Sequence, residues 1–453
     1  MATQTASTDV IIVGAGYAGL TTARELTAKG VEVLVVEARD RVGGRVWTQQ
    51  RDGYWVDVGG QWTGPGQDHI RALGEEMGVA SFPTWPEGEH LSYAEGNPIR
   101  RWSGSVPTDD VETLSKVVQA IMTFDQLAQE VPLGAPWEAP HAKEWDSLTV
   151  QAWIDQNIET PRAREGMTTA IEAVYACEPH DISLLHALFY AKSGQGLFYL
   201  VSTEGGAQAD RFVGGAQQPG IRVAEKLGDR IIMNSPVRRI EQRNGGITVS
   251  GDAFSVSGKL CVVTAPPALA GRIDYDPIMP PLRDQLTTRA PMGSVIKVHA
   301  VYETPWWRDE GLSGRVVSDT GPIRVIFDNS PPEGSPGLLM GFIEGGDGRR
   351  LSNIPFADRR KVALDCFVRY FGDKAAKPID YIEGNWPAEQ WSRGCYGAFF
   401  PAGTWLSCGP ALREPVGRIH WAGTETSEVF AGYIDGAVRS GERVAAEVME
   451  VLD

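Results

Sequence analysis

The chain has 453 residues, 42% of them hydrophobic and 22% charged, and carries a formal net charge of −16. This composition is typical of a folded globular protein, and the length predicts two domains rather than one. The negative charge repels a phosphate backbone, so we expect no nucleic-acid partner.

The cysteines and the N-terminus exclude two further classes of protein. Five cysteines and the absence of a CxxC pair predict neither a disulfide framework nor a metal site, and are typical of a reduced cytoplasmic protein. The first residues lack the basic segment of a signal peptide, and no apolar run is long enough for a transmembrane helix. We therefore expect a cytoplasmic location and no membrane partner.

The first predicted elements form a βαβ unit. Residues 9–13 are apolar and β-branched and predict a buried strand, and residues 14–19 predict a glycine-rich turn. Residues 21–29 predict a helix, and residues 31–36 predict a second strand that ends in Glu37. Such a unit places its two strands parallel in one sheet.

The middle of the chain changes character. Residues 70–195 have apolar residues three and four apart, above all over 111–131, and predict helices. Further strands are predicted over 230–242, 246–251, 259–267, 294–307 and 337–345. A helix over 355–371, a short strand within 418–426 and a last helix that ends near Val448 complete the series. Strands near both ends predict that one domain is assembled from discontinuous segments.

The glycine turn carries the first functional signal. Gly14 permits the tight turn, Gly16 lets a pyrophosphate approach the helix N-terminus, and Gly19 permits close helix–strand packing. Glu37, at the end of the second strand, can accept hydrogen bonds from both ribose hydroxyls. A glycine turn alone is weak evidence, but strand, helix, second strand and terminal glutamate together predict dinucleotide binding.

A second glycine-rich region indicates which dinucleotide is bound. A diffusible NAD requires an open site, whereas glycine contacts that continue past Glu37 favour a buried, permanent FAD. Arg45 also offers a planar guanidinium to a phosphate. An ordinary surface turn is the alternative for this region. Its candidate cofactor residues are Arg39, Gly43, Gly44, Arg45, Gly60, Gln61 and Trp62.

The segments GAGYAGL, VVEARDRVGGR and VDVGGQW resemble the flavin amine oxidase family, in particular its monoamine oxidase branch. PMGSVIKVHAVYETPWW, WSRGCYGAFFPAG and IHWAGTETSEVFAGYIDGAVRSGERVA continue the resemblance along nearly the whole chain. It implies an α/β fold of two domains. The Rossmann-like FAD-binding domain takes residues 1–80, 205–285 and 390–453, and a substrate domain with a mixed sheet and helices takes residues 81–204 and 286–389.

The resemblance also assigns residues to the cofactor. It places the backbone of Val237 at the adenine, Trp386 beside the flavin, and Thr424 and Glu425 near the diphosphate and flavin. Cys395 matches the cysteine that forms a thioether with the flavin 8α-methyl group. On the residues alone, Cys395 could equally be a small buried hydrophobe.

Three further residues receive catalytic roles from the resemblance. Tyr396 and Tyr433 match two aromatic rings that flank the substrate amine, although simple core packing is the alternative for either ring. Lys297 lies in a β-branched stretch, and on spacing alone it could face solvent. The resemblance implies instead that Lys297 holds a water against flavin N5 and acts in the reaction with O2.

The substrate pocket is predicted from Leu200, Gln208 and Val325. Val325 is apolar where diamine oxidases of the family carry a glutamate, and the neighbouring Arg324 should point to the opposite face of its strand. The distal pocket is therefore predicted to be apolar. This favours amines with one amino group and an aryl or alkyl tail.

The resemblance implies a homodimeric enzyme that oxidises primary amines. The amine gives a hydride to flavin N5, the imine is hydrolysed to an aldehyde and ammonia, and O2 is reduced to hydrogen peroxide. Membrane-bound relatives end in a long apolar tail that this sequence lacks, so we expect no membrane anchoring. The alternatives are a secondary (nicotine-type) amine oxidase, an amino-acid oxidase of the same fold, and a non-catalytic flavin-binding module.

Overall fold

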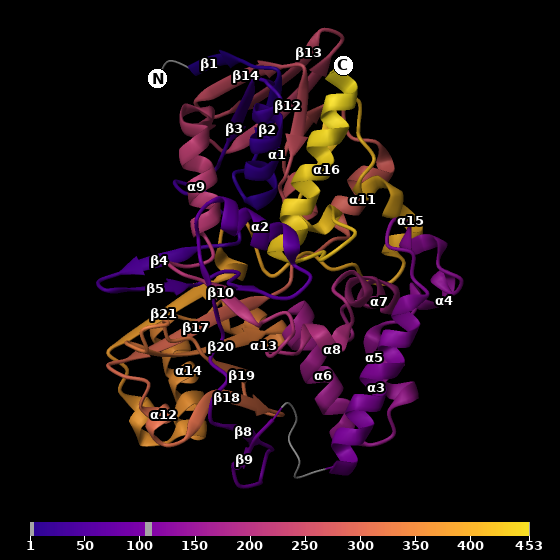
Figure 1. Ribbon diagram of the computed structural model, residues 1–453. Coiled ribbons are helices and arrows are strands. Elements are labelled where there is room, and N and C mark those ends of the chain that lie inside the picture. The colour runs from indigo at the N-terminus through magenta and orange to yellow at the C-terminus, as the bar shows by residue number, and fades with distance from the viewer. Residues whose placement is uncertain (1–3, 105–110, 453) are drawn as a thin grey trace.

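The computed structural model describes residues 4–104 and 111–452. In Figure 1 a parallel sheet with helices α1 and α16 occupies the upper half, and both chain ends lie there. A larger sheet and a group of helices lie side by side in the lower half. This arrangement confirms the predicted α/β fold with a Rossmann-like part and a second part that combines a mixed sheet with helices. The boundaries between the two domains stay a prediction.

The Rossmann-like sheet is assembled from segments far apart in the chain, as predicted. All its strands run parallel. Helices α1 (Tyr17–Ala28) and α16 (Ile434–Leu452) pack against each other beside it. In spatial order the strands are β11 (Ile231–Ile232), β3 (Val33–Val36), β2 (Val10–Val13), β15 (Leu260–Val263) and β22 (Ile419–Trp421).

Two glycines explain the tight passage from β2 into α1. Gly14 has a φ of +105°, a conformation that L side chains rarely adopt. A Cβ atom on Gly19 would lie 1.9 Å from the Gly14 carbonyl oxygen, so only glycine lets the helix start this close to the strand. The roles predicted for these two residues agree with this geometry.

Further sheets accompany the Rossmann-like sheet, and the first of them also has five strands. One has the order β1 (Gln4–Ser7), β14 (Phe254–Gly258), β13 (Gly246–Gly251), β12 (Val237–Arg243) and β16 (Asp274–Asp276). The others are β6 (Trp62–Thr63), β10 (Asp210–Phe212) and β7 (Ser81–Pro83), and the hairpin of β4 (Thr48–Arg51) and β5 (Tyr54–Asp57).

The large lower sheet is mixed, because β8 and β18 pair in parallel and its other neighbouring strands pair antiparallel. Every residue of its strand β17 is buried. Lys297 lies in that strand, so the interpretation that Lys297 faces solvent is wrong. The strands are, in spatial order, β21 (Asp380–Asn385), β17 (Val295–Tyr302), β20 (Gly337–Glu344), β19 (Ile323–Asp328), β18 (Leu312–Ser318), β8 (Glu89–Tyr93) and β9 (Arg100–Trp102).

Helices cover both halves, and α3 and α14 confirm the helices predicted over 111–131 and 355–371. The helices that follow or interrupt the strands of the lower sheet along the chain are α3 (Val111–Gln129), α4 (Ala142–Trp145), α5 (Val150–Asn157), α6 (Pro161–Tyr175), α7 (Leu184–Ser193), α8 (Leu197–Leu200), α12 (Trp306–Asp309), α13 (Gly345–Leu351) and α14 (Phe356–Phe371). The remainder are α2 (Asp68–Glu76), α9 (Gln218–Leu227), α10 (Pro267–Ala270), α11 (Pro281–Thr288) and α15 (Thr404–Cys408). Within residues 4–104 and 111–452, no helix combines the length and apolarity that crossing a membrane requires.

Candidate active site

One cavity of about 1160 Å³ connects the two halves of the molecule. Its wall includes Gly16 and Glu37 from the Rossmann-like part. It also includes Lys297, Tyr396 and Tyr433. The predicted cofactor and amine residues therefore lie along one continuous space.

The nucleotide end of this cavity is organised around Glu37. The carboxylate is 3% exposed and follows directly after β3. Its Oε2 accepts a hydrogen bond from Ala15 N at 2.7 Å, and its Oε1 accepts one from Arg39 N at 2.9 Å. A carboxylate has further acceptor sites, so it can also receive ribose hydroxyls. Glu37 thus fixes the glycine turn and retains acceptor capacity for a nucleotide.

The second glycine segment lies against the first. Gly16 and Gly43 form an isolated parallel bridge, and Gly44 lines the cavity beside them. A Cβ atom placed on Gly16 would have Gly44 Cα, 3.8 Å away, as its nearest neighbour. The atom that approaches Gly16 here therefore belongs to backbone. Two glycine loops therefore present bare backbone to the cavity, as a bound pyrophosphate requires.

Arg45 forms a buried ion pair with Glu425. Its guanidinium donates to both carboxylate oxygens at 2.6 and 3.0 Å and to the Tyr396 carbonyl at 2.9 Å. Burial alone would raise the pKa of Glu425, but the charge and hydrogen bonds of Arg45 outweigh burial and lower that pKa. The pair joins the second glycine segment to the C-terminal segment. Arg45 itself lines the cavity, whereas Glu425 lies behind it.

Lys297 is 3% exposed and reaches the cavity from β17. Its Nζ donates to Gly59 O at 2.8 Å and to Gln61 Oε1. Gln61 Nε2 in turn donates to Asn329 Oδ1 at 2.8 Å. The ammonium also lies 5.7 Å from the centroid of the Trp62 ring. The amine nitrogen is thereby held at one point of the cavity wall.

Burial changes the acid–base chemistry of this lysine. It lowers the pKa of Lys297 to about 7, although the carboxylate of Asp57 opposes the change. Arg211 adds a like charge that lowers the pKa further. At neutral pH Lys297 therefore exchanges between ammonium and amine, unlike a lysine in water.

The two tyrosines predicted to face the amine, and the cysteine predicted to bind the flavin covalently, come from two distant segments. Cys395 and Tyr396 precede the turn into α15, and Tyr433 immediately precedes α16. All three line the cavity. The Thr424 hydroxyl donates to the Tyr433 carbonyl at 2.8 Å and holds that loop. Burial raises the pKa of the Cys395 thiol to about 12.

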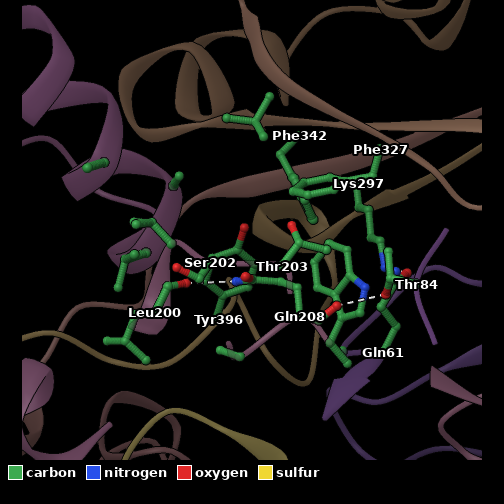
Figure 2. Close-up of a pocket in the computed structure, with 18 of the residues that line it drawn as sticks. Gln61, Thr84, Leu200, Ser202, Thr203, Gln208, Lys297, Phe327, Phe342 and Tyr396 are labelled. Atoms are coloured by element: carbon green, nitrogen blue, oxygen red, sulfur yellow. Dashed lines mark hydrogen bonds between the residues drawn. The ribbon is translucent and has the colours of Figure 1, made fainter. Parts of the chain in front are cut away.

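The part of the cavity shown in Figure 2 combines the aromatic rings of Phe327, Phe342 and Tyr396 with polar side chains that include Gln61, Ser202 and Gln208. Phe342 meets the Tyr396 ring edge-on, with centroids 6.0 Å apart, and Phe327 meets Trp62 edge-on at 5.0 Å. Gln208 Nε2 donates to the Leu200 carbonyl at 2.8 Å. The polar amide is thus tied to the wall.

The structure brings most of the predicted site residues to the cavity wall. Those that line it are Gly16, Glu37, Arg39, Gly43, Gly44, Arg45, Gly60, Gln61, Trp62, Leu200, Gln208, Lys297, Val325, Cys395, Tyr396, Thr424 and Tyr433. The predicted residues outside the wall are Gly14, Gly19, Val237, Trp386 and Glu425. Trp386 lies behind the wall and donates from Nε1 to Val58 O at 2.8 Å.

Sequence reasoning missed several residues of this site. Asp57 and Arg211 set the charge environment of Lys297, and Phe342 completes the aromatic wall. Arg315 of β18 also lines the cavity, and it makes no ion pair with any carboxylate in the described part of the chain. No short motif marks these residues, because each acts through segments distant in sequence.

Comparison with known proteins identifies the chemistry that this cavity serves. Residues 17–449 match the sequence model described as flavin containing amine oxidoreductase. The chain belongs to this family. It is therefore a flavin-dependent amine oxidase, which confirms the predicted enzyme class and FAD cofactor.

Individual relatives of this amine oxidase cover almost its full length. It is 42% identical to a putative flavin-containing monoamine oxidase, AofH, of Mycobacterium tuberculosis, over 98% of this chain and 97% of the relative. A structure of putrescine oxidase bound to putrescine has a TM-score of 0.94 and 35% identity, over 98% of this chain and 100% of that chain. Cyclohexylamine oxidase from Brevibacterium oxydans has a TM-score of 0.94 and 34% identity, over 98% and 99%.

The residues present fit FAD. The paired glycine loops leave backbone exposed where a pyrophosphate would bind, and the buried Glu37 carboxylate retains acceptor sites for ribose hydroxyls. At the opposite end, Lys297 and Cys395 reach the same cavity. An elongated dinucleotide can therefore extend from Glu37 towards the two tyrosines.

Proposed function

We propose that this amine oxidase acts on primary monoamines with an aryl or alkyl tail. When bound, FAD would supply the redox chemistry of the proposed reaction, which is hydride removal from the amine and reduction of O2 to hydrogen peroxide. The imine is hydrolysed to an aldehyde and ammonia. The protein's residues orient the amine between Tyr396 and Tyr433 and exclude water.

The observation that carries the proposal concerns the counter-charge that a second amino group would need. Among the described residues, no buried carboxylate of the cavity wall beyond the nucleotide end lacks a partner. Asp210 and Asp328 are paired with Arg71 at 2.7 Å and with Arg308 at 2.7 Å. Asp319 accepts a hydrogen bond from a backbone amide at 3.0 Å, and Glu204 is exposed to solvent.

The chamber beside the tyrosines is closed by apolar groups. Val325, Phe327 and Phe342 line it, and burying an ammonium against such side chains without a counter-charge costs several kcal/mol. Arg315 adds positive charge to the same cavity. Both features disfavour a diamine and favour a neutral tail.

A second candidate substrate class is favoured by Arg315. A guanidinium without a carboxylate partner in the described residues can bind a carboxylate at the far end of an amine. A relative named L-amino acid dehydrogenase from Synechocystis is 37% identical over 98% of this chain. The Arg315 guanidinium is the reason to include amines with a distal acid group in the test.

Anaerobic flavin reduction distinguishes these candidates. Phenethylamine, its N-methyl derivative, putrescine and 5-aminopentanoate should be mixed separately with the oxidised enzyme, and the loss of flavin absorbance followed. We expect phenethylamine to have the highest specificity constant. A higher value for putrescine overturns the monoamine proposal, a higher value for the N-methyl derivative indicates a secondary amine oxidase, and a higher value for the amino acid establishes the second candidate. Reduction by none of them supports a non-catalytic module.

We further propose that the flavin is bound covalently through Cys395. The thiol lines the cavity near Tyr396 and Lys297. A redesign of cofactor binding in a similar putrescine oxidase replaced an alanine by a cysteine. The homodimeric state and the cytoplasmic location stay predictions.

A further inference from the structure

A small second cavity lies behind the Tyr396 ring. It has a volume of about 240 Å³ and is separate from the main cavity. Charged side chains line it: Glu172, Glu178, Arg324, Glu344 and Asp347. The Tyr396 hydroxyl donates a hydrogen bond of 2.7 Å to Glu344 Oε1. Tyr396 therefore has its ring in one cavity wall and its hydroxyl bound to the wall of the other.

Most carboxylates around this second cavity have an arginine partner. Glu172 pairs with Arg324 at 3.0 Å. Glu178 pairs with Arg349, and Asp347 pairs with Arg350 at 2.5 Å.

Glu344 differs from these carboxylates. Its one hydrogen bond from a side chain in the described residues comes from Tyr396, and no lysine or arginine there lies within ion-pair distance of it. Glu344 is partly exposed, and a carboxylate that is shielded in part from water and lacks a counter-charge still carries a desolvation cost. Its missing counter-charge therefore requires an explanation.

The environment makes Glu344 responsive near neutral pH. Burial raises the pKa of Glu344 to about 8, against the hydrogen bond from Tyr396. The negative charge of Glu172 raises that pKa further, and Arg324 opposes it. Glu178 and Asp347, which also face this cavity, are paired with their own arginines. Burial raises the pKa of Glu172, the partner of Arg324, to about 7. A cation bound against the Tyr396 ring would favour the ionised form of Glu344.

We propose that Glu344 is a positioning residue that determines substrate specificity. Its carboxylate fixes the Tyr396 ring through the hydroxyl. Its negative charge makes the site between Tyr396 and Tyr433 bind an ammonium group more tightly than a neutral group. The inference rests on the placement of the amine between Tyr396 and Tyr433 proposed above. Phe342 meets the Tyr396 ring edge-on, so the ring is held by packing as well as by its hydroxyl. The substrate ammonium is then the counter-charge of Glu344 across the ring.

The test uses a pair of probes that differ in charge alone. 2-Phenylpropan-2-amine has no α-hydrogen and cannot be oxidised, and 2-phenylpropan-2-ol is its neutral counterpart. The dissociation constants of both are measured on the flavin-loaded enzyme by the change in the flavin spectrum between pH 6 and 8.5. In the wild type, the preference for the amine over the alcohol should increase about tenfold as Glu344 ionises.

Substitutions separate charge from position. Glu344→Gln keeps an acceptor for Tyr396 but cannot ionise, so the rise in preference near pH 8 should disappear while alcohol binding stays the same. Lys297 and Glu172 have pKa values of about 7 in both enzymes, so any change in preference near pH 7 should remain in the variant. Glu344→Leu removes the acceptor as well, so both probes should bind more weakly. Asp347→Asn, in the same cavity but paired with the exposed Arg350, should behave as the wild type.

The outcomes are distinct. A Glu344→Gln enzyme that retains the wild-type pH dependence overturns the inference. If that variant does not fold, Tyr396→Phe replaces it: loss of the hydrogen bond should move the rise in preference to higher pH, and an unmoved rise overturns the inference. A wild type that binds neither probe and oxidises no amine refutes the proposed function instead.

Discussion

Replacing Lys297 by methionine should change how the stability of this enzyme depends on pH. The pKa of Lys297 falls from 10.5 to about 7 on folding, which corresponds to about 5 kcal/mol against the buried charged form. Between pH 7 and 10.5 the unfolded chain binds more protons at this lysine than the folded chain does. Stability therefore rises with pH over this window. From pH 7 to 9 the contribution amounts to about 2 kcal/mol.

Urea unfolding followed by tryptophan fluorescence measures this effect at pH 7 and pH 9. The free energy of unfolding of the wild type should increase by about 2 kcal/mol relative to that of Lys297→Met. Lys361→Met is the matched control, because Lys361 is 75% exposed and paired with Asp365. The free energy of unfolding of Lys361→Met should change between pH 7 and pH 9 by the same amount as that of the wild type. If the value for Lys297→Met also changes by this amount, Lys297 does not titrate near neutral pH and the reasoning from its burial is wrong.

Four further outcomes are expected. Lys297→Met should slow the reaction of the reduced enzyme with O2 far more than it slows reduction of the enzyme by amine, because a donor beside the flavin stabilises developing negative charge. Stopped-flow measurement of both half-reactions checks this. Equal losses in the two rates would indicate a structural role for Lys297. Tyr433→Ala should lower turnover at unchanged flavin content by about tenfold, the equivalent of roughly 1 kcal/mol or more for a desolvated cation–π contact; unchanged kinetics would assign Tyr433 to packing. Acid-precipitated wild type should stay yellow and Cys395→Ala should lose its colour on washing; colour lost from both would exclude the covalent link. Glu425→Gln should destabilise the protein by about 3 kcal/mol, because Arg45 is left buried and without its charged partner; a thermal midpoint equal to that of the wild type would contradict this.

The Rossmann-like part could be predicted from sequence because its signals are local. Gly14, Gly19 and Glu37 lie within one βαβ unit, where spacing alone fixes the turn, the helix and the end of the second strand. The strands near the C-terminus were likewise recognisable by their apolar runs. The discontinuous assembly of the sheet followed from their positions at both ends of the chain.

The environment of Lys297 could not be predicted from its own strand. Alternation puts Lys297 and His299 on one face with a single valine, a pattern that also suits a solvent-facing edge. The structure covers both faces of β17, and Asp57 and Arg211 approach Lys297 from other segments. Tertiary packing therefore determines that Lys297 is buried, and among the sequence signals only the family resemblance indicated this burial.

Glu344 shows the same limit more clearly. In the sequence it is an unremarkable acidic residue at the end of an apolar strand before two glycines. Its significance arises from Tyr396, which lies 52 residues further along the chain. No spacing rule connects the two.

The order in which the sheet is completed has a consequence for biosynthesis. The glycine turn is among the first parts of the chain to leave the ribosome, but β22, the partner of β15, is among the last. Two further contacts form later still: Glu425 pairs with Arg45, and α16 packs on α1. A nascent chain that already displays the glycine turn therefore lacks the partners that would stabilise it, so flavin capture should be a post-translational event whose yield depends on free FAD at release of the finished chain.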